Sequence, residues 1–156
     1  MYTAGMSLAA ALKKGQDCVG VAVVFLIHDG KGNILLHKRS KEARDERSTW
    51  DAGGGGLEFG DTVEETLRRE VQEEFCADVI EYEFMGFRDV HRTHEGRPTH
   101  WIALDFKVLV DPAQVKIGEP HKVDDIGWFR LEAFPSPLHS KFPRFLEQHR
   151  HFLERL

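Results

Sequence analysis

Three glutamates close together in one segment are the side chains of this sequence best suited to chemistry. Glu73 and Glu74 follow Glu70 by three and four positions, a spacing that places side chains on one side of a helix. On a helical wheel Glu74 falls inside the apolar stripe of the segment, Glu70 lies on its edge, and Glu73 flanks Glu70. A carboxylate turned toward a core costs several kcal/mol unless it is neutralised, protonated or paired. A positive group is therefore expected beside them.

Two kinds of positive partner fit this acidic edge. The first is an arginine, and Arg69 has the i,i+4 spacing to Glu73 that favours an ion pair on a helix. The second is a divalent cation, which the sequence favours because only this one arginine is placed to serve three carboxylates. Oxygen-only ligands select a hard ion, Mg²⁺ or Mn²⁺, over zinc. The sequence thus predicts a magnesium site that manganese can also fill.

The residues before the glutamates indicate how they are positioned. Asp61 and Glu64 have the spacing of a capping box, so we expect a helix from Asp61 to about Phe75. Four consecutive glycines, 53–56, precede this helix, and glycine favours no regular element. Without side chains, their backbone can approach an ion and a phosphate closely. A glycine run, a capped helix and converging carboxylates together indicate a metal–phosphate site.

Apolar periodicity predicts the elements around this helix. Strands are expected where apolar and β-branched residues run together or alternate, at 18–27, 34–36, 79–87, 102–110 and 126–129. Polar, charged loops are expected at 40–49 and 89–98. The helical spacing of apolar residues near the C-terminus predicts a closing helix over 139–156. Strands interleaved with two separated helices predict an α/β fold, a mixed sheet with helices on its faces.

Composition and charge bound the kind of protein. The 156 residues are 41% hydrophobic and 30% charged, a balance typical of one soluble domain. A net charge of −5 gives no overall attraction to a nucleic acid polymer, and no apolar run is long enough for a membrane span. Two cysteines make no disulfide framework, which favours reduced thiols and a cytoplasmic location. We expect a lead-in over 1–17 that is not a secretory signal, and one domain over 18–156.

The acidic segment resembles the signature of a known family. The string Gly55-x5-Asp61-x7-Arg69-Glu70-Val71-x-Glu73-Glu74-x-Cys76-Ala77 is similar to the Nudix box, G-x5-E-x7-R-E-U-x-E-E-x-G-U, where U is a bulky aliphatic residue. Asp61 replaces a glutamate, Cys76 replaces a glycine and Ala77 is smaller than usual. No core carboxylate is lost, so activity is expected to survive. A cysteine held in the left-handed conformation after the helix costs about 1 kcal/mol or somewhat more.

The resemblance implies a fold and a chemistry. Nudix enzymes are α/β/α sandwiches that hydrolyse nucleoside diphosphates linked to another group. Carried over by position, the glutamates at 70, 73 and 74 hold one or more Mg²⁺ ions together with the carbonyl of Gly54. Arg69 orients its carboxylate neighbours, and Glu70 is the first choice for the general base.

Residues outside the metal ligands are candidates for substrate contact. Glu119 lies in a loop where some family members supply a further carboxylate as base or ligand, and a solvated loop glutamate is the alternative. Lys38 and Arg39 end the second expected strand and either contact phosphate or are ordinary strand-end charges. Gly55 offers its backbone to the same phosphates.

Histidines and aromatic residues have less specific patterns. His91 and His94, with His100 nearby, suggest zinc, but no third soft ligand has a fitting spacing, so solvated loop histidines are expected. Aromatic side chains either stack on a base or pack in the core, and the candidates are Trp50, Phe87, Trp101 and Trp128.

The resemblance leaves several functions open. The stretch 119–122, Glu-Pro-His-Lys, looks like the branch that cleaves (deoxy)nucleoside triphosphates to monophosphate and pyrophosphate. ADP-ribose or nucleotide-sugar hydrolysis is the alternative within the family. An isopentenyl diphosphate isomerase-like enzyme would need a cysteine in the sheet just before the box, where this sequence has none. A non-catalytic nucleotide-binding module usually lacks the box carboxylates. We expect a monomer or homodimer that acts on a small nucleotide.

Overall fold

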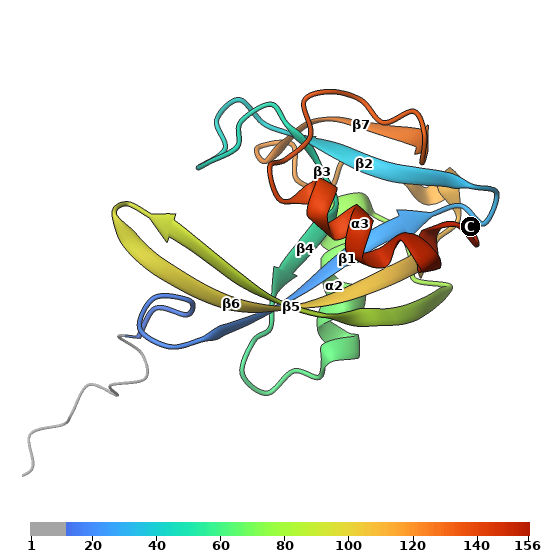
Figure 1. Ribbon diagram of the computed structural model, residues 1–156. Helices are drawn as coiled ribbons and strands as arrows, with labels where there is room; N and C mark the ends of the chain where they lie inside the picture. The colour runs from blue at the N-terminus through green and yellow to red at the C-terminus, as the bar shows by residue number, and fades with distance from the viewer. Residues whose placement is uncertain (1–11) are drawn as a thin grey trace, which may run out of the picture.

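The computed structural model describes residues 12–156, so most of the expected lead-in lies outside the described residues. Figure 1 shows the arrangement of its strands and helices. In chain order these are β1 (Gly20–His28), β2 (Asn33–Arg39), β3 (Trp50–Asp51), β4 (Gly53–Gly56), α2 (Val63–Phe75), β5 (Glu81–His94), β6 (Arg97–Leu109), the 3-10 turn η1 (Pro112–Gln114), β7 (Val123–Arg130) and α3 (Phe142–Leu153). Within 12–156, neither α-helix has the length and apolar character needed to cross a bilayer.

One mixed sheet joins all of these strands. Its order is β3-β2-β1-β6-β5, with β4 added beside β1 and β7 beside β2. β1 and β6 run parallel and every other pair is antiparallel. One edge of β1 therefore pairs first with β4 and then with β2, which brings the glycine strand to the middle of the sheet.

The two helices cover opposite faces of this sheet. Phe25 and Ile27 of β1 pack with Leu67 of α2 in one buried cluster. Leu26, which points to the other side of the same strand, packs with Phe145 of α3 in a second cluster. Figure 1 shows α3 across the near face and α2 behind the strands. The expected α/β/α sandwich is confirmed.

Helix α2 begins one residue later than its sequence pattern suggested. Thr62 is the N-cap, and its side chain and that of Glu65 form the capping box in place of Asp61 and Glu64. The shift leaves the Asp61 carboxylate free to bind an arginine further along the helix. At the other end Cys76 has φ 56°, the left-handed conformation expected of the residue after this helix.

Replacing Cys76 by glycine is expected to stabilise the fold by about 0.5–1 kcal/mol. A side chain costs about 1–2 kcal/mol in the left-handed conformation, and the extra freedom of an unfolded glycine offsets part of this gain. Thermal unfolding of the two proteins measures the difference. A Cys76→Ala protein should not show the gain, because alanine meets the same backbone strain. A glycine variant that unfolds earlier than wild type would contradict the strain argument.

Two segments expected to be irregular are strands. Residues 53–56 form β4, which is held by pairing with β1 and not by the weak strand preference of glycine. The expected loop at 89–98 is the end of a long β5–β6 hairpin, and the chain turns only at Glu95 and Gly96, both with positive φ. Its side chains are polar because this end extends beyond the core (Figure 1). The C-terminal helix is also shorter than the expected 139–156, at Phe142–Leu153.

Candidate active site

The glycine strand lies directly against two of the box glutamates. A Cβ built on Gly55 would stand 2.1 Å from the carboxyl carbon of Glu70. A Cβ built on Gly53 would stand 2.8 Å from Oε2 of Glu74. Any side chain at Gly55 would displace the Glu70 carboxylate, so the glycines are required for the close approach of α2 to β4.

Glu74 is the most deeply buried carboxylate of the group. Its Oε1 accepts a long hydrogen bond of 3.4 Å from the amide of Gly54, while Oε2 is buried and has no hydrogen-bond partner among the described residues. Burial raises its pKa well above the ordinary value, the charges of Glu70 and Glu119 raise it further, and the Gly54 amide opposes them. A buried oxygen without a partner, beside further oxygen donors, fits a hard divalent cation.

Glu70 is half-buried and lies between an acidic and a basic neighbour. Burial raises its pKa, the nearby charge of Glu73 adds to the rise, and Arg69 opposes it. The guanidinium of Arg69 lies 3.6 Å from Glu70 and donates a hydrogen bond to Asp61. Asp61, although shorter than the usual glutamate, therefore anchors the arginine that faces Glu70. The ion pair between Arg69 and Glu73, which was the alternative to a cation, is absent from the described residues, and Glu73 is exposed.

The loop before β7, more than 40 residues after the box in the sequence, brings a fourth carboxylate to the site. The amide of Gly118 donates to the Glu74 carbonyl at 2.9 Å, and a Cβ at Gly118 would collide with the Glu73 carbonyl. This contact places Glu119 near the box carboxylates, and Lys122 Nζ lies 2.8 Å from Glu119. The hydrogen bond from Lys122 to Glu119 raises the pKa of the lysine. The sequence analysis singled out the stretch 119–122 but gave Lys122 no role, although its i,i+3 spacing to Glu119 favours an ion pair.

A cleft of about 850 Å³ has Glu74 and Glu119 in its lining, whereas Glu70 and Glu73 are not part of the lining formed by the described residues. It runs along β4 and β1, between the β5–β6 hairpin and the loop at 40–49, and its volume is ordinary for a nucleotide-sized ligand. Cationic side chains line it, among them Lys14, Arg39, Arg44, Arg92, Lys122 and Lys141. Fewer acidic side chains line it, namely Glu42, Asp45, Asp51, Glu74 and Glu119, so cations are in the majority although the whole chain carries a net charge of −5. This mixture suits a polyphosphate bound together with a cation.

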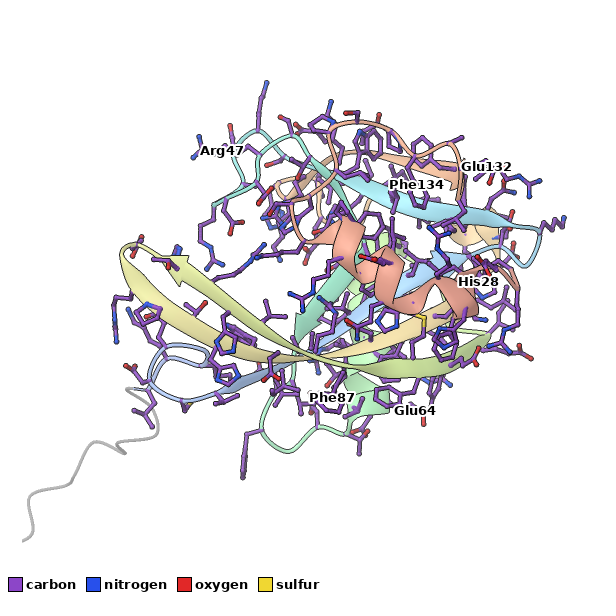
Figure 2. All side chains as sticks on the ribbon, viewed as in Figure 1. His28, Arg47, Glu64, Phe87, Glu132 and Phe134 are labelled. Carbon is purple, nitrogen blue, oxygen red and sulfur yellow. The ribbon has the colours of Figure 1, made fainter. Side chains whose placement is uncertain are left out.

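Only some of the residues expected to contact the substrate line the cleft. Arg39 and His37 line it, whereas Lys38 lies between them on β2 and is not part of the lining formed by the described residues. Trp101 lines the cleft, while three other aromatic candidates, Trp50, Phe87 and Trp128, do not. Figure 2 shows Phe87 on the side of β5 that faces away from α3.

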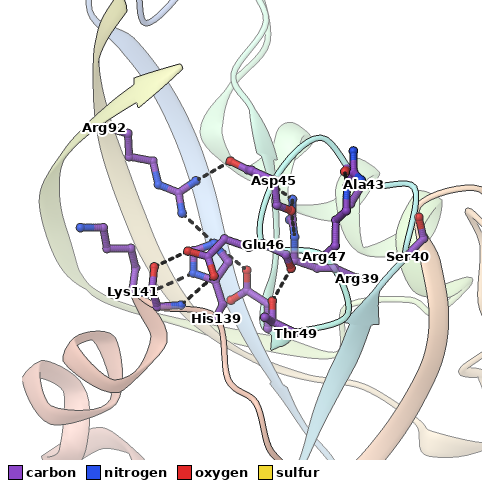
Figure 3. Close-up of polar contacts among 12 residues, drawn as sticks. Arg39, Ser40, Ala43, Asp45, Glu46, Arg47, Thr49, Arg92, His139 and Lys141 are labelled. Carbon is purple, nitrogen blue, oxygen red and sulfur yellow. Dashed lines mark hydrogen bonds and ion pairs between the residues drawn. The ribbon is translucent and has the colours of Figure 1, made fainter. Parts of the chain in front are cut away.

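A polar network fixes the loop at 40–49 across the mouth of the cleft (Figure 3). Arg39 Nη2 lies 2.6 Å from Asp45 Oδ1, and Arg92 Nη1 lies 3.5 Å from Asp45 Oδ2. Arg92 also contacts His139 Nε2 at 2.7 Å. The loop is thus attached both to β2 and to the β5–β6 hairpin.

Three titratable groups beside the cleft have shifted pKa values. Burial, and to a smaller extent the charge of Arg39, lowers the pKa of His37 to about 4. Burial and then the charge of Arg92 lower the pKa of His139 to about 4. Burial raises the pKa of Asp51 to about 6. The two histidines are therefore uncharged at neutral pH. No motif in the sequence pointed to these three residues.

Replacing Glu74 by glutamine is expected to raise the melting temperature of the metal-free protein while lowering its activity. Because the folded-state pKa of Glu74 is raised, the unfolded state releases its proton more readily, and the fold loses stability as pH rises from 4.5 to the folded pKa. The variant lacks this loss, and a gain of about 1 kcal/mol corresponds to about 2–4 °C. Thermal unfolding in chelator across a pH series measures the difference, which should shrink toward pH 4.5.

Glu147→Gln on α3 removes an exposed charge and serves as the control for this stability test. It should leave the melting temperature close to that of wild type at every pH. If the two glutamine variants melt alike, the ionised Glu74 carboxylate does not destabilise the metal-free fold.

Comparisons with known proteins agree with this geometry. The model of the NUDIX domain family matches residues 19–156. Nucleoside triphosphatase NudI of Escherichia coli O139:H28 (strain E24377A / ETEC) is 32% identical over 117 residues, which are 70% of this chain and 82% of that protein. The crystal structure of a MutT Nudix hydrolase from Burkholderia pseudomallei has a TM-score of 0.69 and 27% identity, and the match covers 88% of this chain and 97% of that one. For the MutT protein of Methanosarcina mazei Go1 the values are 0.73, 26%, 90% and 97%. With Glu70 and Glu74 held against a glycine strand beside the cleft, the chain belongs to the Nudix hydrolase family and is a nucleotide pyrophosphohydrolase.

Proposed function

We propose that this enzyme hydrolyses a (deoxy)nucleoside triphosphate to the monophosphate and pyrophosphate with Mg²⁺ as cofactor. The observation that carries the proposal is the buried oxygen of Glu74 that has no hydrogen-bond partner within residues 12–156, in a cleft whose lining includes several cations. An oxygen site of this kind suits a hard cation, and the cationic lining suits a chain of phosphates. The 32% identity to a nucleoside triphosphatase favours triphosphates over other nucleotide conjugates.

The box residues have distinct tasks in this proposal. Glu70, Glu73, Glu74 and the carbonyl of Gly54 hold the metal. When bound, Mg²⁺ neutralises charge on the phosphate oxygens and favours attack by water on phosphorus. Glu70 accepts the proton of the attacking water, because it lies beside the metal ligands at the margin of the buried face of α2. Arg69, tied to Asp61, holds Glu70 in place.

Groups across the cleft bind the rest of the substrate. Arg39, Lys122 and the backbone of Gly55 contact phosphate oxygens in this proposal, which is supported by the presence of all three in the cleft lining. Glu119 serves as a further metal ligand or as an alternative base, because its charge acts on both Glu70 and Glu74. Trp101 is the aromatic side chain available for a base. Residues 18–156 act as one domain, as a cytoplasmic monomer or homodimer.

A substrate panel tests the proposal. The purified protein is incubated with Mg²⁺ and each of the common nucleoside and deoxynucleoside triphosphates, ADP-ribose and nucleotide sugars, and the products are separated by ion-exchange chromatography. Triphosphates should give monophosphate and pyrophosphate, and chelator should abolish turnover until Mg²⁺ or Mn²⁺ is restored. Faster release of AMP from ADP-ribose would favour the alternative within the family. Activity that survives exhaustive chelation would contradict the metal dependence.

A further inference from the structure

A cluster of three metal-binding side chains lies on the β5–β6 hairpin, away from the box. Asp89 and His91 are two positions apart on β5 and share a face, and His100 of β6 pairs directly with His91. One ligand atom from each residue can be chosen so that all three lie within 4.8 Å of one another. The register of the sheet creates this cluster, which the sequence spacing of the histidines did not reveal.

The side chains are already partly aligned. His100 Nε2 lies 2.9 Å from Asp89 Oδ1, and the imidazole rings of His91 and His100 are stacked with centroids 4.3 Å apart. Ligand atoms held about 2.0–2.2 Å from one zinc ion in a tetrahedral site lie about 3.3 Å apart. Small rotations of these exposed side chains would therefore bring the three atoms to coordination distance.

The cluster occupies the opposite face of the hairpin from the cleft. Val90, Arg92 and Trp101 alternate with its members along the two strands and line the cleft. Phe87, two positions before Asp89, marks the outer face in Figure 2. The site is thus separate from the box carboxylates, although it is built on the strands that form one wall of the cleft.

We propose that Asp89, His91 and His100 bind a zinc ion on the outer face of the hairpin. Two imidazoles and one carboxylate are ligands that zinc prefers, whereas Mg²⁺ selects all-oxygen sites such as the box. Three protein ligands leave a fourth tetrahedral position for water or an external ligand. The ion replaces the hydrogen bond between His100 and Asp89. It also joins β5 to β6 beside the cleft wall.

Zinc titration in excess Mg²⁺ tests the site without measuring activity. The full chain, free of any histidine tag and treated with chelator, is titrated by calorimetry while about 10 mM Mg²⁺ competes for the hard, all-oxygen box site. We expect one equivalent of zinc to bind. His91→Gln and His100→Gln should each weaken binding at least about tenfold, because even indirect supports of metal ligands contribute about 10–100-fold in affinity. The same hairpin provides the matched control His94→Gln, which should bind zinc as wild type does.

Two further readouts locate the ion. Zinc should shift the imidazole nuclear magnetic resonance signals of His91 and His100 and leave those of His94 and His121 in place. It should also raise the melting temperature by several degrees in wild type and in His94→Gln, because a ligand that binds only the folded state stabilises it. The two ligand variants should lose this rise.

Three outcomes would overturn the proposal. One is that wild type binds no zinc in the presence of Mg²⁺. A second is that His91→Gln and His100→Gln bind one equivalent as tightly as wild type, which would place the ion elsewhere. The third is that the resonance shifts fall on other histidines. Circular dichroism of each variant checks that these exposed substitutions leave the fold intact, so a loss of binding reports on the ligands.

Discussion

Turnover is expected to fall at least about a hundredfold when Glu73 is replaced by glutamine. Removing a group that stabilises charge at a reaction centre costs about 10²–10³ in kcat. Glu73 is exposed and forms no ion pair within residues 12–156, so its loss should leave the fold intact and act on the reaction alone. Steady-state release of pyrophosphate from the best substrate of the panel measures the effect.

Glu64→Gln is the matched control for this experiment. It makes the same chemical change on the same helix, at an exposed glutamate that pairs with Arg68 at 2.9 Å. An exposed pair of this kind contributes little to stability, so turnover should stay within about twofold of wild type. Wild-type turnover in Glu73→Gln would remove Glu73 from the metal ligands and leave the buried Glu70 and Glu74 as the acidic site.

The part of the site that is local in sequence could be predicted from the sequence. Helical spacing correctly put Glu74 toward the core and Glu70 at its margin, because the 3.6-residue period fixes which side chains share a face. The left-handed conformation of Cys76 followed from its place just after the helix. The alternative pairing of Arg69 with Glu73 did not form, because Glu73 turns to solvent. Arg69 binds Asp61 instead, which is free because the capping box formed one residue later than expected.

Features that depend on pairing between distant segments could not be predicted in this way. The strand at 53–56 exists because β1 offers unpaired backbone groups beside it, and glycine has no pattern that announces this. The cluster of Asp89, His91 and His100 depends on the register between β5 and β6, which the histidine spacing does not contain. Lys122 reaches the site because the loop before β7 lies against the end of α2.

Asp105 shows the same limit and carries the second large prediction. The alternation of apolar residues in 102–110 predicted a half-buried strand, whose polar face would meet water. In the structure α3 packs on the face of β6 to which Asp105 points, so the Asp105 side chain is 0% exposed. Asp105 accepts two hydrogen bonds from Arg88, at 2.5 and 2.8 Å, and its Oδ2 lies 2.7 Å from Nε2 of His149 on α3. This carboxylate therefore ties α3 to the sheet.

Replacing Asp105 by asparagine is expected to destabilise the protein by about 3–5 kcal/mol, because removing one partner of a buried ion pair leaves the other charge uncompensated. Arg88 keeps its charge and is only 15% exposed, so water replaces the lost carboxylate only in part. The melting temperature should fall by about 10 °C, since 1 kcal/mol corresponds to about 2–4 °C at this chain length. Urea unfolding measures the free energy. The control is Glu83→Gln, which breaks the more exposed contact to Lys107 at 2.9 Å and should cost at most about 1 kcal/mol. Equal stability of the two variants would mean that α3 is held by its apolar residues alone.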